Sequence, residues 1–181
     1  DREWRRETKD LGLTFGGMHR TCPVVEADTE RAVIVFSDGS FGKDVYPWGG
    51  SFTWFKNSVL SWFSRKAKFP PDSTCMIEMD MLVQGLKEAL FTQNVLEDMM
   101  CPTDAPHVIS DSKSAIDIIK NPGVTKRSIH YDRRLFFARD AFLRGRIVPF
   151  LCGTDKMMAD GMTKIVDKTK FFLCRNYMMN V

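Results

Sequence analysis

The chain has 181 residues, of which 44% are hydrophobic and 27% are charged, with a formal net charge of +3. This composition is typical of one globular domain, and a chain of this length buries a sufficient core without disulfides. No apolar run approaches the roughly 20 residues of a membrane span, and no signal-peptide pattern is present. Because the chain begins at Asp1 rather than Met, we expect it to be a piece of a longer polypeptide.

The cysteines and histidines limit the kind of metal site to expect. The five cysteines are scattered and form no Cys-x-x-Cys pair, and the three histidines are equally dispersed. This usage favours reduced thiols in an intracellular compartment over a structural zinc site. A metal site would therefore be built from carboxylates, which suit Mg²⁺ or Mn²⁺.

Positive charge is concentrated in the last third of the chain. From residue 121 onward there are 12 Lys and Arg against 5 Asp, a net of +7, whereas residues 1–120 carry 14 minus 18, or −4. A basic segment of this kind predicts a surface that faces a polyanion, although solvated helix faces would give the same count.

Hydrophobic periodicity predicts the element order β, β, β, α, β, α, α, β, α. The first strand is an unbroken apolar run typical of a central strand, and the next two form a tight hairpin because only two residues separate them. The expected strands cover residues 31–38, 50–55, 58–63, a short run ending at Asp111, and 146–151; the expected helices run from Ser73 or Thr74 to about Met99, from Ser112 to 119, from about 128 to 144, and over 156–164.

Acidic residues occur at the ends of two predicted strands and at the start of the last predicted helical region. Asp38 ends the first strand, Asp111 ends the fourth, and Asp160 begins the last helical region. If the strands are parallel, these acids share the sheet edge at which α/β proteins bind ligands. Glu78, in the first turns of the long helix, projects toward the same edge. Four converging acids would repel one another unless they held divalent cations, and oxygen-only ligation suits a pair of Mg²⁺ ions.

Two of these acids also have simpler interpretations. Asp111 could be an ordinary helix N-cap, and Glu78 could be a boundary residue that leans into water. In the same long helix, Gly85 costs about 1 kcal/mol relative to Ala, which predicts close packing of this helix on the sheet.

The motifs occur in a specific order that resembles one family. They are Ser-Asp-Gly-Ser at 37–40, the hairpin sequences at 50–55 and 59–66, Ser73-Thr74 with Glu78 ahead of 87–90, Ser-Asp-Ser-Lys-Ser-Ala-Ile at 110–116, Asn121-Pro122, His130-Tyr131-Asp132, and Ala-Asp-Gly-Met-Thr-Lys at 159–164. Together they resemble the RNase H domain of copia-type LTR retrotransposon polyproteins. Residues 8–15 are similar to the segment that joins the reverse transcriptase to that domain.

The resemblance implies an α/β, RNase H-like fold: a five-stranded mixed sheet, with three antiparallel and then two parallel strands, flanked by helices. It also implies three parts of the chain. Residues 1–30 would be a connecting arm from a preceding reverse transcriptase, residues 31–165 the RNase H-like domain, and residues 166–181 a C-terminal basic and apolar tail.

The implied activity is that of a metal-dependent endoribonuclease. It would cleave the RNA strand of RNA/DNA hybrids during reverse transcription, leaving 3′-hydroxyl and 5′-phosphate ends. The resemblance assigns Asp38, Glu78, Asp111 and Asp160 as catalytic ligands of two Mg²⁺ ions, with Mn²⁺ as an alternative. The partners would be the hybrid and the reverse transcriptase domain of the same polyprotein, with no membrane, and the place would be the cytoplasm, a virus-like particle or the nucleus.

Several residues are expected to contact the hybrid, which is recognised by shape and by its 2′-hydroxyls. Hydroxyl side chains near the catalytic edge are candidates: Ser40, Ser73, Thr74 and Ser112, the last standing where the family often has Asn. The loop at 121–127 must climb the height of the sheet, which would bring Lys126, Arg127 and His130 beside the site. For His130, the simpler interpretation is packing under the start of the next helix. Met76 and Met79 also depart from the family pattern around Glu78.

Two other functions fit parts of the sequence. One is a non-catalytic RNase H-like nucleic-acid-binding or connection module from a decayed or repurposed retroelement. The presence of all four acids argues against it. The other is an integrase-type strand transferase on the same fold, which would need its Glu last in order, whereas here Glu78 comes second.

Overall fold

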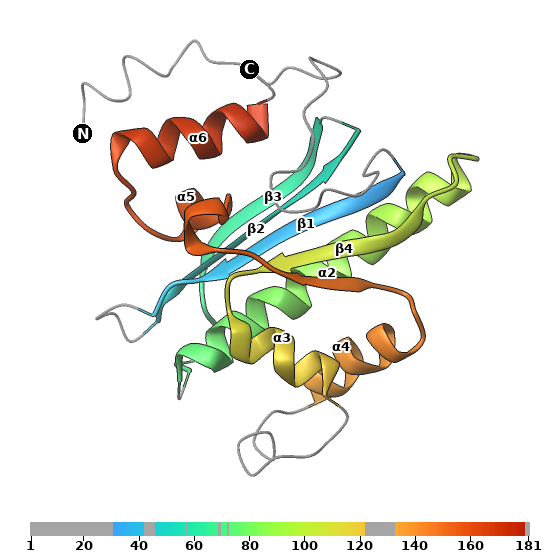
Figure 1. The fold of residues 1–181 in the computed structure, drawn as a ribbon, viewed down its shortest axis with the longest axis horizontal. Coiled ribbons are helices and arrows are strands. Elements are labelled where there is room, and N and C mark those ends of the chain that lie inside the picture. The colour runs from blue at the N-terminus through green and yellow to red at the C-terminus, as the bar shows by residue number, and fades with distance from the viewer. Residues whose placement is uncertain are drawn as a thin grey trace.

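A computed structural model describes residues 31–41, 46–56, 58–68, 70–71, 73–121 and 133–179 (Figure 1). In chain order the elements are β1 (Ala32–Gly39), β2 (Trp48–Phe55), β3 (Ser58–Lys66), α2 (Thr74–Asp98), β4 (Asp104–Ser110), α3 (Lys113–Lys120), α4 (Arg133–Leu143), β5 (Val148–Leu151), the 3-10 turn η1 (Thr154–Lys156), α5 (Asp160–Thr163) and α6 (Lys168–Met179). Among the described helices, none is long and apolar enough to cross a membrane.

The five strands form one mixed sheet in the order β3-β2-β1-β4-β5. β1 and β2, and β2 and β3, pair antiparallel, whereas β4 pairs parallel to β1 and β5 pairs parallel to β4. The predicted RNase H-like sheet, three antiparallel strands and then two parallel ones, is therefore confirmed. Because β1, β4 and β5 run in the same direction, their carboxyl ends share one edge, and Pro149 lies in a strand at the border of the sheet, as expected.

Side chains alternate along β1 between two cores, as the pleat of a strand requires. Val33 and Val35 face a core formed with α2, α3 and α4, and Ile34 and Phe36 face a second core on the other side. Figure 1 shows α2, α3 and α4 on one side of the sheet and α5 and α6 on the other. The chain thus forms three layers with the sheet in the middle.

Helix α6 closes the second core, and the sequence did not predict it: its apolar and basic residues had indicated only a tail. Tyr177 of this helix is buried, with its ring stacked on Trp54 at 5.5 Å and edge-on to Phe36 at 5.7 Å. Aromatic pairs in this geometry stabilise a core beyond the area they bury. The last described helix is therefore packed directly on the sheet.

Other boundaries also differ from the sequence prediction. The helix expected over 156–164 is divided into η1 and α5, because Met157, Met158 and Ala159 between them are buried in the second core. β5 begins at Val148, later than expected. The described part of α4 begins at Arg133, and the predicted start near residue 128 lies outside the described residues.

Gly85 allows α2 to lie against the sheet at close range, as predicted. A Cβ atom at this position would lie 2.2 Å from Ser37 Oγ and 2.9 Å from Ser51 Oγ. We expect Gly85→Val to lower the free energy of unfolding by about 1–3 kcal/mol, the usual cost of overpacking a core. Urea unfolding measures this, with Asn94→Val on the exposed side of α2 as the control. A Gly85→Val protein no less stable than Asn94→Val would contradict the close packing at Gly85.

Candidate active site

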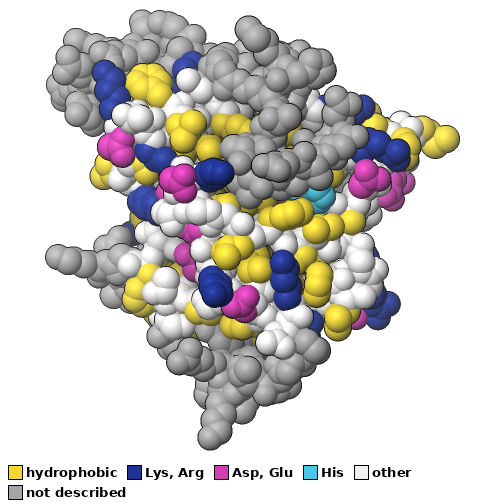
Figure 2. Space-filling view, viewed as in Figure 1, with side chains coloured by type: hydrophobic (Ala, Val, Ile, Leu, Met, Phe, Trp, Pro, Cys, Tyr) yellow, Lys and Arg dark blue, Asp and Glu magenta, His cyan; other side chains and the backbone are white. Residues whose placement is uncertain are grey.

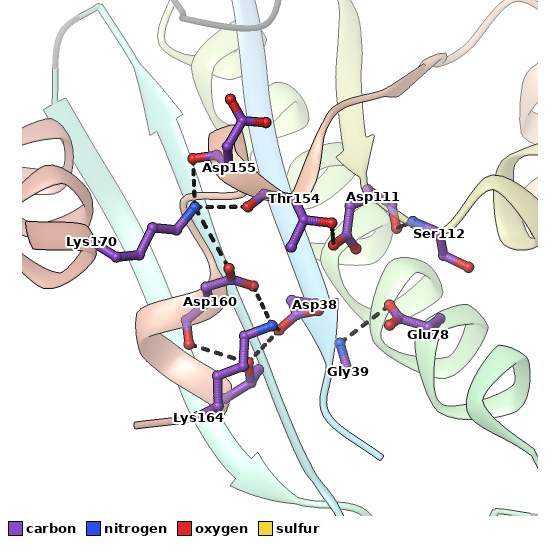
Figure 3. A network of polar contacts seen from close by, with 12 residues as sticks. Asp38, Gly39, Glu78, Asp111, Ser112, Thr154, Asp155, Asp160, Lys164 and Lys170 are labelled. Carbon is purple, nitrogen blue, oxygen red and sulfur yellow. Dashed lines mark hydrogen bonds and ion pairs between the residues drawn. The ribbon is translucent and has the colours of Figure 1, made fainter. Parts of the chain in front are cut away.

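Three acidic side chains converge at the carboxyl edge of the sheet. Asp38 is the second-last residue of strand β1, Asp111 directly follows β4, and Glu78 projects from the beginning of α2. One carboxylate oxygen from each lies within 4.8 Å of the others. Asp38 and Glu78 are buried, at 2% and 8% exposure, and Asp111 is partly buried. Figure 3 shows Glu78 and Asp111 on one side of Asp38 and the end of α5 on the other.

A close approach of β1 to α2 brings Glu78 to Asp38. A Cβ atom on Gly39 would lie 3.0 Å from the backbone carbonyl carbon of Ile77, so glycine allows the strand end to touch the first turns of the helix. The Gly39 N–H donates a hydrogen bond to Glu78 Oε2 at 3.2 Å. The interpretation of Glu78 as a boundary residue leaning into water is therefore wrong.

Asp111 is free to act as a ligand because another residue caps the helix that follows it. The N-cap of α3 is Ser112, whose side chain accepts a hydrogen bond from the Ala115 N–H at 3.3 Å. The N-cap interpretation of Asp111 is therefore wrong. Thr154, which follows β5, donates a hydroxyl hydrogen bond to Asp111 Oδ2 at 3.1 Å and so holds one of its oxygens.

The fourth predicted acid, Asp160, lies beside this cluster and is bound by lysines. It is 3% exposed. Lys164 Nζ lies 2.8 Å from its Oδ1, and Lys170 Nζ lies 3.6 Å from its Oδ2. The Lys164 ammonium also lies 3.9 Å from Asp38 Oδ2, so it bridges the two acids (Figure 3). The structure thus places Asp160 next to Asp38 but outside the group of three.

Helix α5 supplies a further partner to Asp38. The hydroxyl of Thr163 donates a hydrogen bond to Asp38 Oδ2. This contact requires α5 to lie on β2, where a Cβ atom on Gly50 would lie 2.4 Å from Met162 Cβ. Gly50 pairs with Asp38 across the β1–β2 ladder, so the absent side chain lets α5 reach the acid.

The sequence interpretation missed Thr163, Lys164 and Lys170. A signal for the first two was present, because residues three and four positions after Asp160 share its side of a helix. No comparable signal existed for Lys170, which reaches the site only because α6 packs on the sheet. Its ammonium donates to the backbone carbonyl oxygens of Thr154 at 2.8 Å and Asp155 at 2.6 Å.

Burial and mutual repulsion make this group of acids hard to ionise. Burial, followed by the charges of Asp38 and Asp111, raises the pKa of Glu78 to about 9. Burial also raises the pKa of Asp38, although Thr163 and Lys164 act against the shift. The pKa of Lys164 is lowered by burial, but its hydrogen bond to Asp160 and the nearby acids outweigh this effect and raise it. The site therefore favours added positive charge.

A divalent cation would satisfy these side chains. Three carboxylates with oxygens this close, two of them buried and raised in pKa, form an all-oxygen donor set of the kind that hard cations bind. A bound cation would lower the raised pKa values of Asp38 and Glu78, so that both side chains would be ionised. The three acids thus fit a Mg²⁺ or Mn²⁺ ligand set, whereas Asp160 already has ammonium partners.

The predicted substrate-binding residues lie in several different environments. The Ser40 N–H donates to the Trp48 carbonyl oxygen at 2.8 Å, Ser73 caps α2 with its side chain, and Thr74 is exposed at the start of that helix. Ser112 caps α3 as described above. Lys126, Arg127 and His130 lie outside the described residues.

Two basic side chains at the same edge were not among the predicted substrate contacts. Arg65 and Lys66 are exposed at the end of β3, and Arg65 is in register with Gly49, which is in register with Gly39. The Lys66 ammonium lies 5.8 Å from the ring centre of Trp48. Two strand spacings of about 4.8 Å therefore separate the backbone of Arg65 from the end of β1.

Comparisons with known proteins agree with the fold. The chain is 29% identical over 163 residues to the retrovirus-related Pol polyprotein from transposon TNT 1-94 of Nicotiana tabacum, a match that covers 90% of the chain. Among solved structures, the N-terminal RNase H domain of a Mycobacterium tuberculosis protein, studied as a maltose-binding protein fusion, matches with a TM-score of 0.55 and 14% identity over 81% of this chain and 97% of its own. The chain has an RNase H-like fold and is similar to a copia-type retrotransposon Pol polyprotein.

A second structural relative of this RNase H-like chain is LC11-RNase H1 in complex with an RNA/DNA hybrid. It matches with a TM-score of 0.54 and 12% identity over 72% of this chain and 93% of its own. No family model matches the chain. The chain spans 12% of the length of the tobacco polyprotein, so it corresponds to only a small part of that relative.

Proposed function

We propose that this RNase H-like domain is a divalent-cation-dependent endoribonuclease that cleaves the RNA strand of RNA/DNA hybrids during retrotransposon reverse transcription. The observation that carries the proposal is the convergence of Asp38, Glu78 and Asp111 at the carboxyl edge of an RNase H-like sheet, with their oxygens within 4.8 Å. The products would be 3′-hydroxyl and 5′-phosphate ends.

In this proposal the three acids hold the cation, and neighbouring donors fix their orientation. Bound divalent cations would activate a water molecule for attack on the phosphorus and stabilise the leaving 3′-oxygen. Gly39 fixes one oxygen of Glu78, Thr163 fixes one of Asp38, and Thr154 fixes one of Asp111. Each acid thus keeps a second oxygen for a cation.

The hybrid would be bound through its backbone rather than its bases. Arg65 and Lys66 would contact phosphates, and the hydroxyls of Ser40, Ser73, Thr74 and Ser112 would contact the strand near the acids. We extend the proposal to Lys126, Arg127 and His130, which are expected from the sequence to lie beside the site. On the face shown in Figure 2 the described basic, acidic and apolar side chains are interspersed.

The similarity to a Pol polyprotein also supports a proposal for the protein partner, the cofactor and the place of action. The polymerase partner would be the reverse transcriptase domain of the same polyprotein, joined through residues 1–30. The cofactor would be two Mg²⁺ ions, replaceable by Mn²⁺, with Asp160 completing the ligand set. The place of action would be the cytoplasm, a virus-like particle or the nucleus.

A cleavage assay on three substrates tests the proposed function. An end-labelled RNA strand is presented alone, in an RNA/RNA duplex and in an RNA/DNA hybrid, with Mg²⁺ or with EDTA. We expect cutting only in the hybrid and only with Mg²⁺. Hybrid binding without cutting would contradict the nuclease and favour the non-catalytic binding module instead, and cutting in all three substrates would contradict the hybrid specificity.

A further inference from the structure

The ammonium group of Lys164 lies between the carboxylates of Asp38 and Asp160. The Lys164 ammonium is 2.8 Å from Asp160 Oδ1 and 3.9 Å from Asp38 Oδ2. Both carboxylate side chains are almost fully buried, whereas the side chain of Lys164 is 42% exposed. A cation placed between two buried carboxylates offsets part of the cost of burying their charges. Lys164 therefore neutralises the position between Asp38 and Asp160.

The second lysine of the site is held in a different way. Lys170 is 14% exposed and contacts Asp160 Oδ2 together with the backbone carbonyl oxygens of Thr154 and Asp155. These contacts tie α6 to the catalytic edge, so Lys170 is a fixed structural partner. Within the described residues the ammonium of Lys164 contacts only the two carboxylates, and its side chain is far more exposed than that of Lys170, so it can leave them without breaking the fold.

The charges of the site balance with one divalent ion rather than two. Four carboxylates carry four negative charges, and the ammonium groups of Lys164 and Lys170 supply two positive charges. One divalent ion on Asp38, Glu78 and Asp111 would complete the neutralisation. A further divalent ion would leave an excess of two positive charges, which the departure of Lys164 or the arrival of substrate phosphates would reduce, since like charges at this range in a buried site repel strongly.

We propose that Lys164 is a tethered cation that holds the space between Asp38 and Asp160 in the free domain. It limits the free domain to one bound divalent ion, on Asp38, Glu78 and Asp111. Lys164 must leave the two carboxylates before Asp160 can take part in binding a second ion. The proposal rests on the proposed function for its place in catalysis, but the number of ions bound by the free domain does not depend on activity.

The test is the number of Mn²⁺ ions bound by the free protein, measured by electron paramagnetic resonance of the unbound ion. We expect one ion for the wild type and two for Lys164→Met. Lys164→Arg, which keeps the positive charge, should bind one. Lys168→Met is the matched control, because Lys168 is exposed four residues further along the chain, and it should also bind one.

A merely structural role for Lys164 would leave the number of bound ions unchanged. Two ions in the wild type, or one in Lys164→Met, would overturn the proposal. Two ions in the wild type would overturn the proposal even if a variant fails to fold. In cleavage, the Mg²⁺ concentration at half-maximal rate should fall several-fold in Lys164→Met and not in Lys168→Met. A wild type that binds one ion but cuts no hybrid would contradict the proposed function while leaving this inference intact.

Discussion

The substitution Asp111→Asn is expected to abolish cation-dependent cleavage of a hybrid while the domain remains folded. Asn keeps the shape of the side chain and can still accept the Thr154 hydroxyl hydrogen bond, but it loses the charge that a divalent cation requires. Even outer partners of metal ligands contribute about 10–100-fold to affinity or activity, so loss of a ligand should reduce the rate by more than about 100-fold.

Asp111 is the best of the three acids for this test because it is the least buried. Removing its charge also relieves its repulsion of Asp38 and Glu78, so the stability of the cation-free protein should be unchanged or higher. Asp117→Asn, at an exposed position of α3, is the matched control and should cut at the wild-type rate. Equal rates for both variants would remove Asp111 from the site.

The second large effect concerns the stability of the cation-free protein. In the unfolded chain Glu78 loses its proton near its ordinary pKa of 4.5, whereas in the folded domain the pKa is raised to about 9. Between these values the folded state binds the proton and the unfolded state does not. The stabilisation is therefore complete below pH 4.5 and is lost as the pH rises toward 9, by at most about 1.4 kcal/mol per pH unit.

Urea unfolding in EDTA at a series of pH values measures this dependence. The free energy of unfolding should fall between pH 5 and 9 in the wild type, and the fall should be smaller in Glu78→Gln, whose amide cannot ionise. Burial lowers the pKa of His107, which acts in the opposite direction, but it acts equally in both proteins. Saturating Mg²⁺ should also flatten the wild-type profile. Identical slopes in the two proteins would contradict the raised pKa.

The parts of the fold that could be predicted are those in which local sequence and tertiary packing agree. The apolar run before Asp38 can be buried only between two layers, and the cap at Ser73 with a long apolar stripe defines α2. The acids could be assigned to one edge because parallel strands end there together. Local pattern and tertiary structure give the same answer at these positions.

The parts that could not be predicted depend on contacts between segments distant in sequence. Tyr177 of helix α6 is buried only because Trp54 and Phe36 lie beneath it. The division of the predicted helix over 156–164 has the same cause. The position of Lys164 between Asp38 and Asp160 likewise depends on the packing of α5 on β2, and a sequence pattern of acids contains no information about it.

The most direct test of the proposed nuclease is single-turnover cleavage of a labelled hybrid in Mg²⁺, comparing the wild type with Asp111→Asn purified in parallel. The parallel preparation is needed because a trace of host nuclease would cut the same substrate. The proposal predicts cutting of the RNA strand by the wild type and none by the variant. Equal cutting by both preparations, or no cutting by a wild type that binds the hybrid, would contradict it.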